Sequence, residues 1–230
     1  MTQQAKVDFD QYAEKYDDLL EQNVAFFGEG NEYFAEYKVR TTAGLVVGQP
    51  KRILEYGCGT GRNLPYFKEL FPEATLVGCD ISEKSLEVGR KLVPGATFFT
   101  LGNPAAEPAT EPFDLIFVAG VFHHVQPPQR AEVMADIVRR ARPGADIVIF
   151  EHNPYNPVTR KLVSNCIYDA DAVLVPPPEM VRIAEAGKLT VLKRTYTLFF
   201  PAALKAIRGL ENFLGWLPLG GQYFIHCKAR

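Results

Sequence analysis

The sequence lacks several features that would place a protein in a specialised class. Its 25 basic and 27 acidic residues give a net charge of −2, so no basic excess points to a nucleic-acid partner. The four cysteines are far apart and show no CxxC spacing, which indicates reduced thiols. No long uncharged apolar run and no apolar N-terminal region occur. We therefore expect a cytoplasmic protein with no nucleic-acid partner and no transmembrane segment.

Short apolar segments alternate with segments of helical spacing from residue 52 onward. The patterns predict strands and helices in the order 53–56, 62–70, 75–79, 83–93, 96–100, 114–118, 129–142 and 146–150, with a helix at the second, fourth and seventh ranges. Strands this short and apolar imply a parallel sheet covered by helices on both faces. Right-handed crossovers place the carboxyl ends of its strands at one edge, where ligands bind.

The two ends of the chain differ from this middle part. Residues 1–48 show helical spacing and predict a helical cap. Residues 152–178 are rich in proline and show no period, which predicts a long loop. Beyond it, we expect a strand over 189–200, a helix over 202–214 and a last strand over 222–228.

A glycine-rich stretch, 55–61, joins the first predicted strand to the first helix. Glycines there let the backbone turn sharply and approach a ligand closely. The dinucleotide fingerprint needs a sixth-position glycine where this chain has Arg62, so an NAD-dependent oxidoreductase is disfavoured. Asp80 ends the second strand, where a carboxylate can accept hydrogen bonds from ribose hydroxyls. The combination favours a nucleoside ligand without a pyrophosphate.

These residues carry a family resemblance. Residues 53–61 resemble the first motif of class I S-adenosylmethionine-dependent methyltransferases of the small-molecule type. The later family motifs are resembled at 77–82, 113–116, 121–125 and 142–145. Residues 9–17 are similar to the N-terminal helix of the ubiquinone-biosynthesis-like branch.

The resemblance implies an α/β fold with a doubly wound, seven-stranded, mostly parallel, Rossmann-like sheet. Its last strand is antiparallel, an N-terminal helical cap precedes it, and a long loop follows the fifth strand. We expect a single methyltransferase domain over 1–230. Within it, 1–48 forms the cap, 49–151 the cofactor-binding half, and 152–230 the acceptor-side loop and C-terminal strands.

The resemblance also implies that S-adenosyl-L-methionine is the cofactor. It places Glu55 and Gly57 by the methionine end, Asp80 at the ribose and Ile81 against the adenine. Asn103 stands where the family carries an aspartate. The remaining cofactor-binding residues that it implies are Gly59, Gly61, Val118, Ala119, Tyr12 and Tyr16.

The acceptor must be aligned with the methyl group, and a hydroxyl acceptor also needs a base. The predicted catalytic residues are His123, His124 and Glu151, and the predicted substrate-binding residues are His152, Asn153, Tyr168 and Asp169. Each has a plainer interpretation, since a histidine pair is common here in this family and loop acids are often only solvated. No ligand spacing supports a metal site among these residues, so no metal is expected.

The function that these patterns favour is methyl transfer to a small-molecule acceptor, at oxygen rather than at nitrogen or carbon. Residues 151–157 and 217–223 look like segments of bacterial methyltransferases of secondary-metabolite and surface-polysaccharide biosynthesis. The alternatives are a C- or N-methyltransferase with a lipid-like or prenylated acceptor, and a non-catalytic cofactor-binding regulatory module.

The sequence leaves the assembly and surface contacts open. A monomer and a homodimer are both compatible with it. The amphipathic segment 202–214, followed by Trp216, is either a helix packed on the sheet or a weak membrane-surface or lipid-carrier contact.

Overall fold

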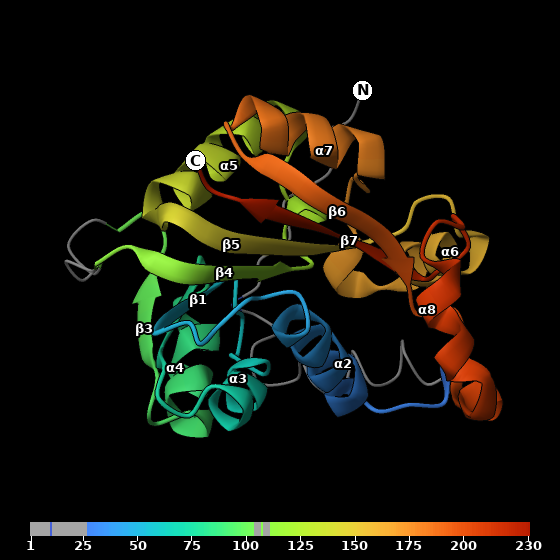
Figure 1. Ribbon diagram of the computed structural model, residues 1–230, viewed down its shortest axis with the longest axis horizontal. Coiled ribbons are helices and arrows are strands. Elements are labelled where there is room, and N and C mark those ends of the chain that lie inside the picture. Colours follow the sequence, from blue (N-terminus) through green and yellow to red (C-terminus); the bar gives the residue numbers. More distant parts are fainter. Residues whose placement is uncertain (1–9, 11–26, 104–106, 108–110) are drawn as a thin grey trace.

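The computed structural model describes Asp10 and residues 27–103, 107 and 111–230. Within these residues, seven strands form one sheet in the order β3-β2-β1-β4-β5-β7-β6 (Figure 1). The strands are β1 (Arg52–Tyr56), β2 (Thr75–Asp80), β3 (Thr97–Thr100), β4 (Phe113–Ala119), β5 (Ala141–His152), β6 (Thr190–Thr197) and β7 (Gln222–Lys228). The first five are parallel, and β7 is antiparallel to both β5 and β6. The predicted seven-stranded, mostly parallel sheet is confirmed.

Helices cover both faces of this sheet (Figure 1). One side carries α2 (Asn31–Ala43), α3 (Leu64–Leu70) and α4 (Glu83–Leu92), and the other carries α5 (Arg130–Arg140) and α7 (Pro177–Ala186). Two apolar cores result, one with Val39, Phe67 and Leu86 and the other with Met134 and Met180, all of them buried. The central strands β1, β2 and β4 are largely buried because helices cover both of their faces, whereas the edge strand β6 is mostly exposed.

The expected long loop after β5 contains helical structure. It includes α6 (Pro157–Asn165) and the 3₁₀ turn η5 (Ile167–Asp169). Asn156 begins α6, because its side-chain oxygen accepts the amide hydrogens of Val158 and Thr159 at 2.9 and 3.1 Å. Asn156 and Pro157, within the segment predicted as a loop, therefore form a helix start, with proline at a position where it suits a helix.

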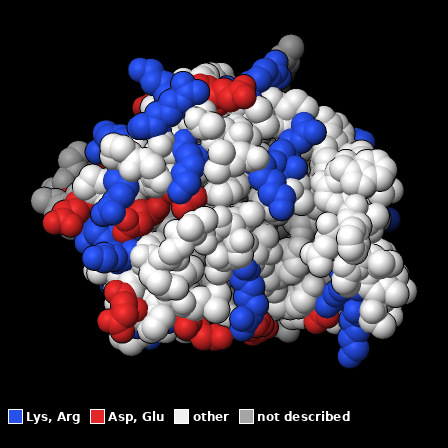
Figure 2. Space-filling model, in the orientation of Figure 1, with Lys and Arg blue, Asp and Glu red and all other residues white. Residues whose placement is uncertain are grey.

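The segment predicted as one helix over 202–214 is also different. It forms a 3₁₀ helix, η6 (Ala202–Leu210), and a short α-helix, α8 (Glu211–Leu214). Leu204 has non-helical backbone angles, and the segment exposes a set of large apolar side chains, Leu204, Ile207, Leu210, Phe213 and Trp216. Figure 2 shows mostly uncharged surface at this end of the molecule. A membrane-surface or lipid-carrier contact here stays a prediction. No helix of the described part of the chain is long and apolar enough to span a membrane.

The strand pairing brings the chemically important loops to one edge. Tyr56 of β1 pairs with Val118 of β4, and Ala119 of β4 pairs with Phe150 of β5. The loop after β1, the turn after β4 and the end of β5 therefore lie beside one another. This edge holds the candidate site.

A buried arginine joins the turn after β4 to the segment before α7 and to α7 itself. Arg130 is 2% exposed; it donates to the carbonyl oxygens of Val125 and Val173 and pairs with Glu179 at 2.6 Å. Arg130→Ala removes a buried side chain that donates to two part-buried carbonyl groups and pairs with Glu179, so the free energy of unfolding should fall by about 1–3 kcal/mol in urea titrations. Arg139→Ala, at a 63% exposed side chain on the same helix, is the control and should change it by less than about 0.5 kcal/mol. Equal effects of the two replacements would contradict this account.

Candidate active site

The loop between β1 and α3 is shaped by glycines. Gly57 and Gly59 have φ angles of 70° and 53°, in the left-handed region that disfavours side chains. A Cβ atom on Gly57 would lie 2.4 Å from a methyl group of Val121, whereas one on Gly59 would meet none of the described residues within 4 Å. The loop is thus packed against the turn after β4 at Gly57 and has no neighbour at Gly59 in the described part of the chain, which suits the close approach of a ligand.

Asp80 at the end of β2 lies against this loop, as the sequence predicted. Its two carboxylate oxygens accept the amide hydrogens of Gly59 at 2.8 Å and of Ser82 at 2.9 Å. Burial raises the pKa of Asp80, and these backbone hydrogen bonds oppose the rise. The carboxylate therefore helps to hold the loop in shape as well as facing its open side.

Glu55 near the end of β1 is a buried acid with one unsatisfied oxygen. Its Oε1 accepts a hydrogen bond from Asn63 at 2.5 Å, while Oε2 is buried and has no hydrogen-bond partner among the described residues. Burial raises the pKa of Glu55 to about 8, although Asn63 and Lys38 oppose the rise. An orphaned buried oxygen of this kind is suited to a donor group of a ligand.

Lys38 of α2 joins the site, and sequence reasoning missed it. Burial, followed by the neighbouring charge of Arg62, lowers the pKa of Lys38 to about 8, while Glu55 and Glu151 act in the opposite direction. The ammonium therefore interacts with acids on both the β1 side and the β5 side of the edge. A signal was present, because Lys38 lies on the same helical stripe as the buried residues Ala35, Val39 and Thr42.

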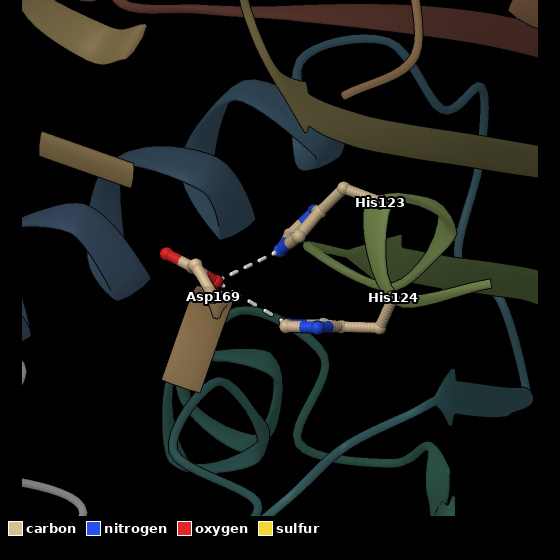
Figure 3. Close-up of side chains that lie close together, drawn as sticks. All are labelled: His123, His124 and Asp169. Atoms are coloured by element: carbon tan, nitrogen blue, oxygen red, sulfur yellow. Dashed lines mark ion pairs between the residues drawn. The ribbon is translucent and has the colours of Figure 1, made fainter. Parts of the chain in front are cut away.

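A histidine–carboxylate cluster lies beside it, at the ends of β4 and β5. We use this name for His123, His124, Glu151, His152, Asp169 and Asp171. His123 and His124 are in the 3₁₀ turn η3 (Phe122–His124), and Asp169 ends η5, so the cluster combines segments far apart in the sequence (Figure 3). The ring centroid of His123 lies 4.1 Å from that of His124 and 4.9 Å from that of His152.

Carboxylates meet both nitrogens of both rings in η3. His123 Nδ1 lies 2.7 Å from Glu151 Oε2, and His124 Nδ1 lies 3.4 Å from Asp171 Oδ1. The two Nε2 atoms point toward one oxygen, Asp169 Oδ1, at 3.3 Å from His123 and 3.5 Å from His124 (Figure 3). Glu151 Oε1 accepts the amide hydrogen of Phe122 at 2.6 Å, so both oxygens of Glu151 are engaged.

The pKa values of the groups in this cluster are strongly shifted. Burial alone would lower the pKa of His123, but the carboxylates of Glu151 and Asp169 raise it well above its usual range. Burial and the neighbouring His123 lower the pKa of His124 and of His152 to about 4. Despite burial, the histidines hold the pKa of Asp169 well below its usual value. Shifts of this size in one place are typical of functional sites.

The structure gives Asn153 a structural place, and its role in substrate binding stays a prediction. It is fully buried, and its amide group donates to the carbonyl oxygens of Pro218 and Gly220 at 3.1 and 2.7 Å. Its side-chain oxygen accepts the amide hydrogen of Tyr155 at 3.0 Å. Because its donors and its oxygen are used within the protein, Asn153 anchors the segment before α6 to the loop before β7.

The other predicted residues are distributed around the two halves of the edge. Ile81 is 53% exposed, Asn103 is exposed, Tyr168 is buried, Val118 lies in the core and Ala119 is half-buried at the strand end. Tyr12 and Tyr16 lie outside the described residues, as does most of the 9–17 segment. The predicted cofactor and acceptor residues thus remain predictions in role, although the fold brings most of them to one edge.

Comparisons with known proteins agree with this geometry. Residues 53–144 match the family model described as "Methyltransferase domain". A trans-aconitate 2-methyltransferase from Azoarcus is 27% identical over 177 residues, which cover 74% of this chain and 65% of the relative. The chain thus spans less than two thirds of the length of that relative.

Solved structures show the same fold at low identity. A methyltransferase from Archaeoglobus fulgidus, described as S-adenosylmethionine-dependent, matches with a TM-score of 0.68 at 18% identity, over 93% of this chain and 99% of that chain. The N-methyltransferase NodS from Bradyrhizobium japonicum, in complex with S-adenosylhomocysteine, matches with a TM-score of 0.63 at 15% identity. That match covers 97% of this chain and 99% of NodS.

The buried acid predicts a pH dependence of folding. Because the folded state raises the pKa of Glu55 to about 8 from 4.5, Glu55 lowers stability progressively as the pH rises between these values. Glu55→Gln should therefore gain at least about 1.4 kcal/mol in free energy of unfolding, relative to the parent, between pH 5 and pH 8. Denaturant titrations of the ligand-free proteins measure this, with the exposed Glu185→Gln as a control that keeps the parent profile. A gain that is the same at both pH values would disprove the assignment.

Proposed function

We propose that the chain is a class I S-adenosylmethionine-dependent methyltransferase that methylates an oxygen of a small polar acceptor bound at the histidine–carboxylate cluster; the match of residues 53–144 to the methyltransferase-domain model supports this. One observation carries the proposal. The glycine-rich loop after β1 and the cluster after β4 and β5 meet at one sheet edge. The pKa of Lys38 responds both to Glu55, beside the loop, and to Glu151, in the cluster. Cofactor and acceptor would thus bind side by side.

The residues on the β1 side fit the cofactor. Glu55 offers an unsatisfied buried oxygen, and the cations Lys38 and Arg62 lie beside it. One acidic side chain beside two cations is complementary in charge to the amino and carboxylate groups at the methionine end of S-adenosylmethionine. Asp80 and the open space at Gly59 suit the ribose. When bound, the cofactor supplies a methyl group made electrophilic by its positively charged sulfur.

The residues on the β5 side would hold the acceptor. They have to orient its nucleophilic atom, exclude water and handle the proton that leaves a hydroxyl. Glu151 uses one oxygen on the Phe122 amide and the other on His123, so it acts through His123 as a positioning residue. This leaves His123 and His124 to contact the reacting oxygen, with His152 and Asp169 beside them for polar groups of the acceptor.

The comparisons support a small polar acceptor without identifying it. The Azoarcus relative is named for trans-aconitate, a small carboxylic acid, whereas NodS is named as an N-methyltransferase. We favour oxygen because the cluster offers the neutral imidazole of His124 and carboxylate oxygens as hydrogen-bond acceptors for a hydroxyl group. A role in bacterial secondary-metabolite or surface-polysaccharide biosynthesis remains part of the proposal.

An acceptor screen tests the reaction. The protein is incubated with methyl-labelled S-adenosylmethionine and a panel of hydroxy acids, polycarboxylates including trans-aconitate, and sugars. We expect release of S-adenosylhomocysteine with at least one acceptor, and an oxygen-bound methyl group in the product by NMR. A nitrogen- or carbon-bound methyl group would overturn the choice of oxygen. Cofactor binding without turnover on any acceptor would favour the regulatory module instead.

The cofactor half has its own test, with S-adenosylhomocysteine as the ligand in calorimetric titrations. Asp80→Ala should weaken binding at least about tenfold, since hydrogen bonds to a charged acceptor contribute roughly 1.5–3 kcal/mol and 1.4 kcal/mol is one decade. Asp80→Asn keeps one acceptor oxygen for the Gly59 amide and separates loss of charge from collapse of the loop. Unchanged affinity in Asp80→Ala would refute the ribose assignment.

A matched pair of ligands separates the two ends of the cofactor. 5′-Methylthioadenosine has the nucleoside but lacks the amino-acid end. Lys38→Met should therefore weaken S-adenosylhomocysteine and leave 5′-methylthioadenosine unchanged, whereas Asp80→Ala should weaken both. If Lys38→Met weakened the binding of both ligands equally, Lys38 would not contact the carboxylate at the amino-acid end of S-adenosylhomocysteine.

A further inference from the structure

The nitrogens of two adjacent rings converge on one carboxylate oxygen in the histidine–carboxylate cluster. The Nε2 atoms of His123 and His124 face Asp169 Oδ1 at 3.3 and 3.5 Å. The opposite nitrogen, Nδ1, of each ring meets a different carboxylate, Glu151 at 2.7 Å and Asp171 at 3.4 Å. A neutral imidazole that donates from Nδ1 carries a lone pair on Nε2. Two such lone pairs and a carboxylate oxygen can therefore meet at one point, from rings whose centroids are 4.1 Å apart.

We propose that His123 Nε2, His124 Nε2 and an oxygen of Asp169 form a site for a divalent transition-metal ion. With an ion there, each ring is neutral, presents its Nε2 lone pair to the metal and donates Nδ1–H to a carboxylate. Glu151 and Asp171 then serve the two Nδ1 atoms, in the carboxylate–histidine–metal arrangement common around metal ligands. The ion would thus have three converging ligand atoms, and the two rings that supply nitrogens are each held by a further carboxylate.

The spacing of the ligand atoms suits such an ion. Metal–ligand distances near 2.1 Å place neighbouring ligand atoms about 3.0–3.5 Å apart. Asp169 Oδ1 lies 3.3 and 3.5 Å from the two Nε2 atoms, and the three atoms all lie within 4.8 Å of one another (Figure 3). Two imidazoles and one carboxylate are ligands for Zn²⁺ and for Fe²⁺, Co²⁺ or Ni²⁺, rather than for Mg²⁺ or Ca²⁺.

The ligands are held in place by neighbouring contacts. The carbonyl oxygen of His123 accepts the amide hydrogen of Val173 at 2.7 Å, which ties η3 to the segment after η5. The amide of Asp169 donates to Cys166 and its carbonyl oxygen accepts from Ala172, at 3.1 and 2.9 Å. The His124 and Asp169 side chains are 19% and 12% exposed, so they border the open side of the cluster. The site is therefore preorganised and accessible to an ion.

The ion would also define the acceptor class, an inference that rests on the proposed function. Three protein ligands leave coordination positions open, as in catalytic zinc sites. An acceptor with two neighbouring oxygen donors, such as a hydroxy acid or a vicinal diol, could occupy them and be oriented as a chelate. In that case His123 and His124 would act through the ion instead of contacting the reacting oxygen directly. The ion would make the bound hydroxyl a stronger acid, and the proton would leave to solvent as the acceptor binds, before water is excluded.

Cobalt binding tests the site without cofactor or acceptor. The purified chain is treated with chelator and titrated with Co²⁺ while the visible absorption of the ion is recorded; Zn²⁺ affinity is then measured by competition. We expect one equivalent to bind. Asp169→Asn and His124→Gln, both at partly exposed side chains and nearly isosteric, should each weaken binding at least tenfold. His226→Gln replaces the only histidine outside the cluster and is the matched control, which should bind as the parent does.

The outcomes separate this proposal from the proposed function. Absence of a stoichiometric Co²⁺ or Zn²⁺ complex, or equal binding by the parent and both ligand variants, would overturn the metal site. An intense thiolate-to-cobalt absorption band would place the ion on a cysteine and would also overturn it. Near-UV circular dichroism of each variant shows whether it is folded. Since no turnover is measured, metal binding stands or falls independently of methyl transfer.

Discussion

The contact on which the rest of the site depends is the buried Glu151 carboxylate at the end of β5. One oxygen accepts the Phe122 amide hydrogen and the other meets His123 Nδ1, so a single side chain fixes the turn after β4 in both backbone and side chain. A fully buried carboxylate is costly unless its oxygens are paired, and removal of one partner would leave the charge uncompensated. This constraint sets the direction of the His123 ring, and thereby where its Nε2 atom lies relative to His124 and Asp169.

The cofactor half could be predicted from the sequence because its signals are local. The glycine loop, Asp80 and the strand–helix alternation each depend on residues close together in the chain, and parallel pairing of β1 with β2 brings them together. Lys38 escaped prediction for a different reason. Its helix contributes to the site only through packing onto the sheet, and a lysine on a buried stripe was the one available sign.

The acceptor half could be predicted only in part because it depends on long-range folding. Polar residues at the end of β5 all carry the same sequence signal, yet Glu151 enters the cluster while Asn153 anchors backbone carbonyl groups. Asp169 meets the histidines only because α6 and η5 turn the chain back toward η3. No spacing of ligands along the sequence reports that proximity, which is why a metal site was not expected from the sequence.

The charges along this edge connect its two halves. On the β1 side, Glu55 and Asp80 lie near the cations Lys38 and Arg62, whereas on the β5 side Glu151, Asp169 and Asp171 surround histidines. The pKa of Lys38 responds to acids of both sides. Interactions between charges strengthen where water is excluded, so the three acids of the β5 side favour a positively charged ligand over a neutral one of the same shape. The excess of acid on that side thus favours a divalent cation between the histidines and Asp169.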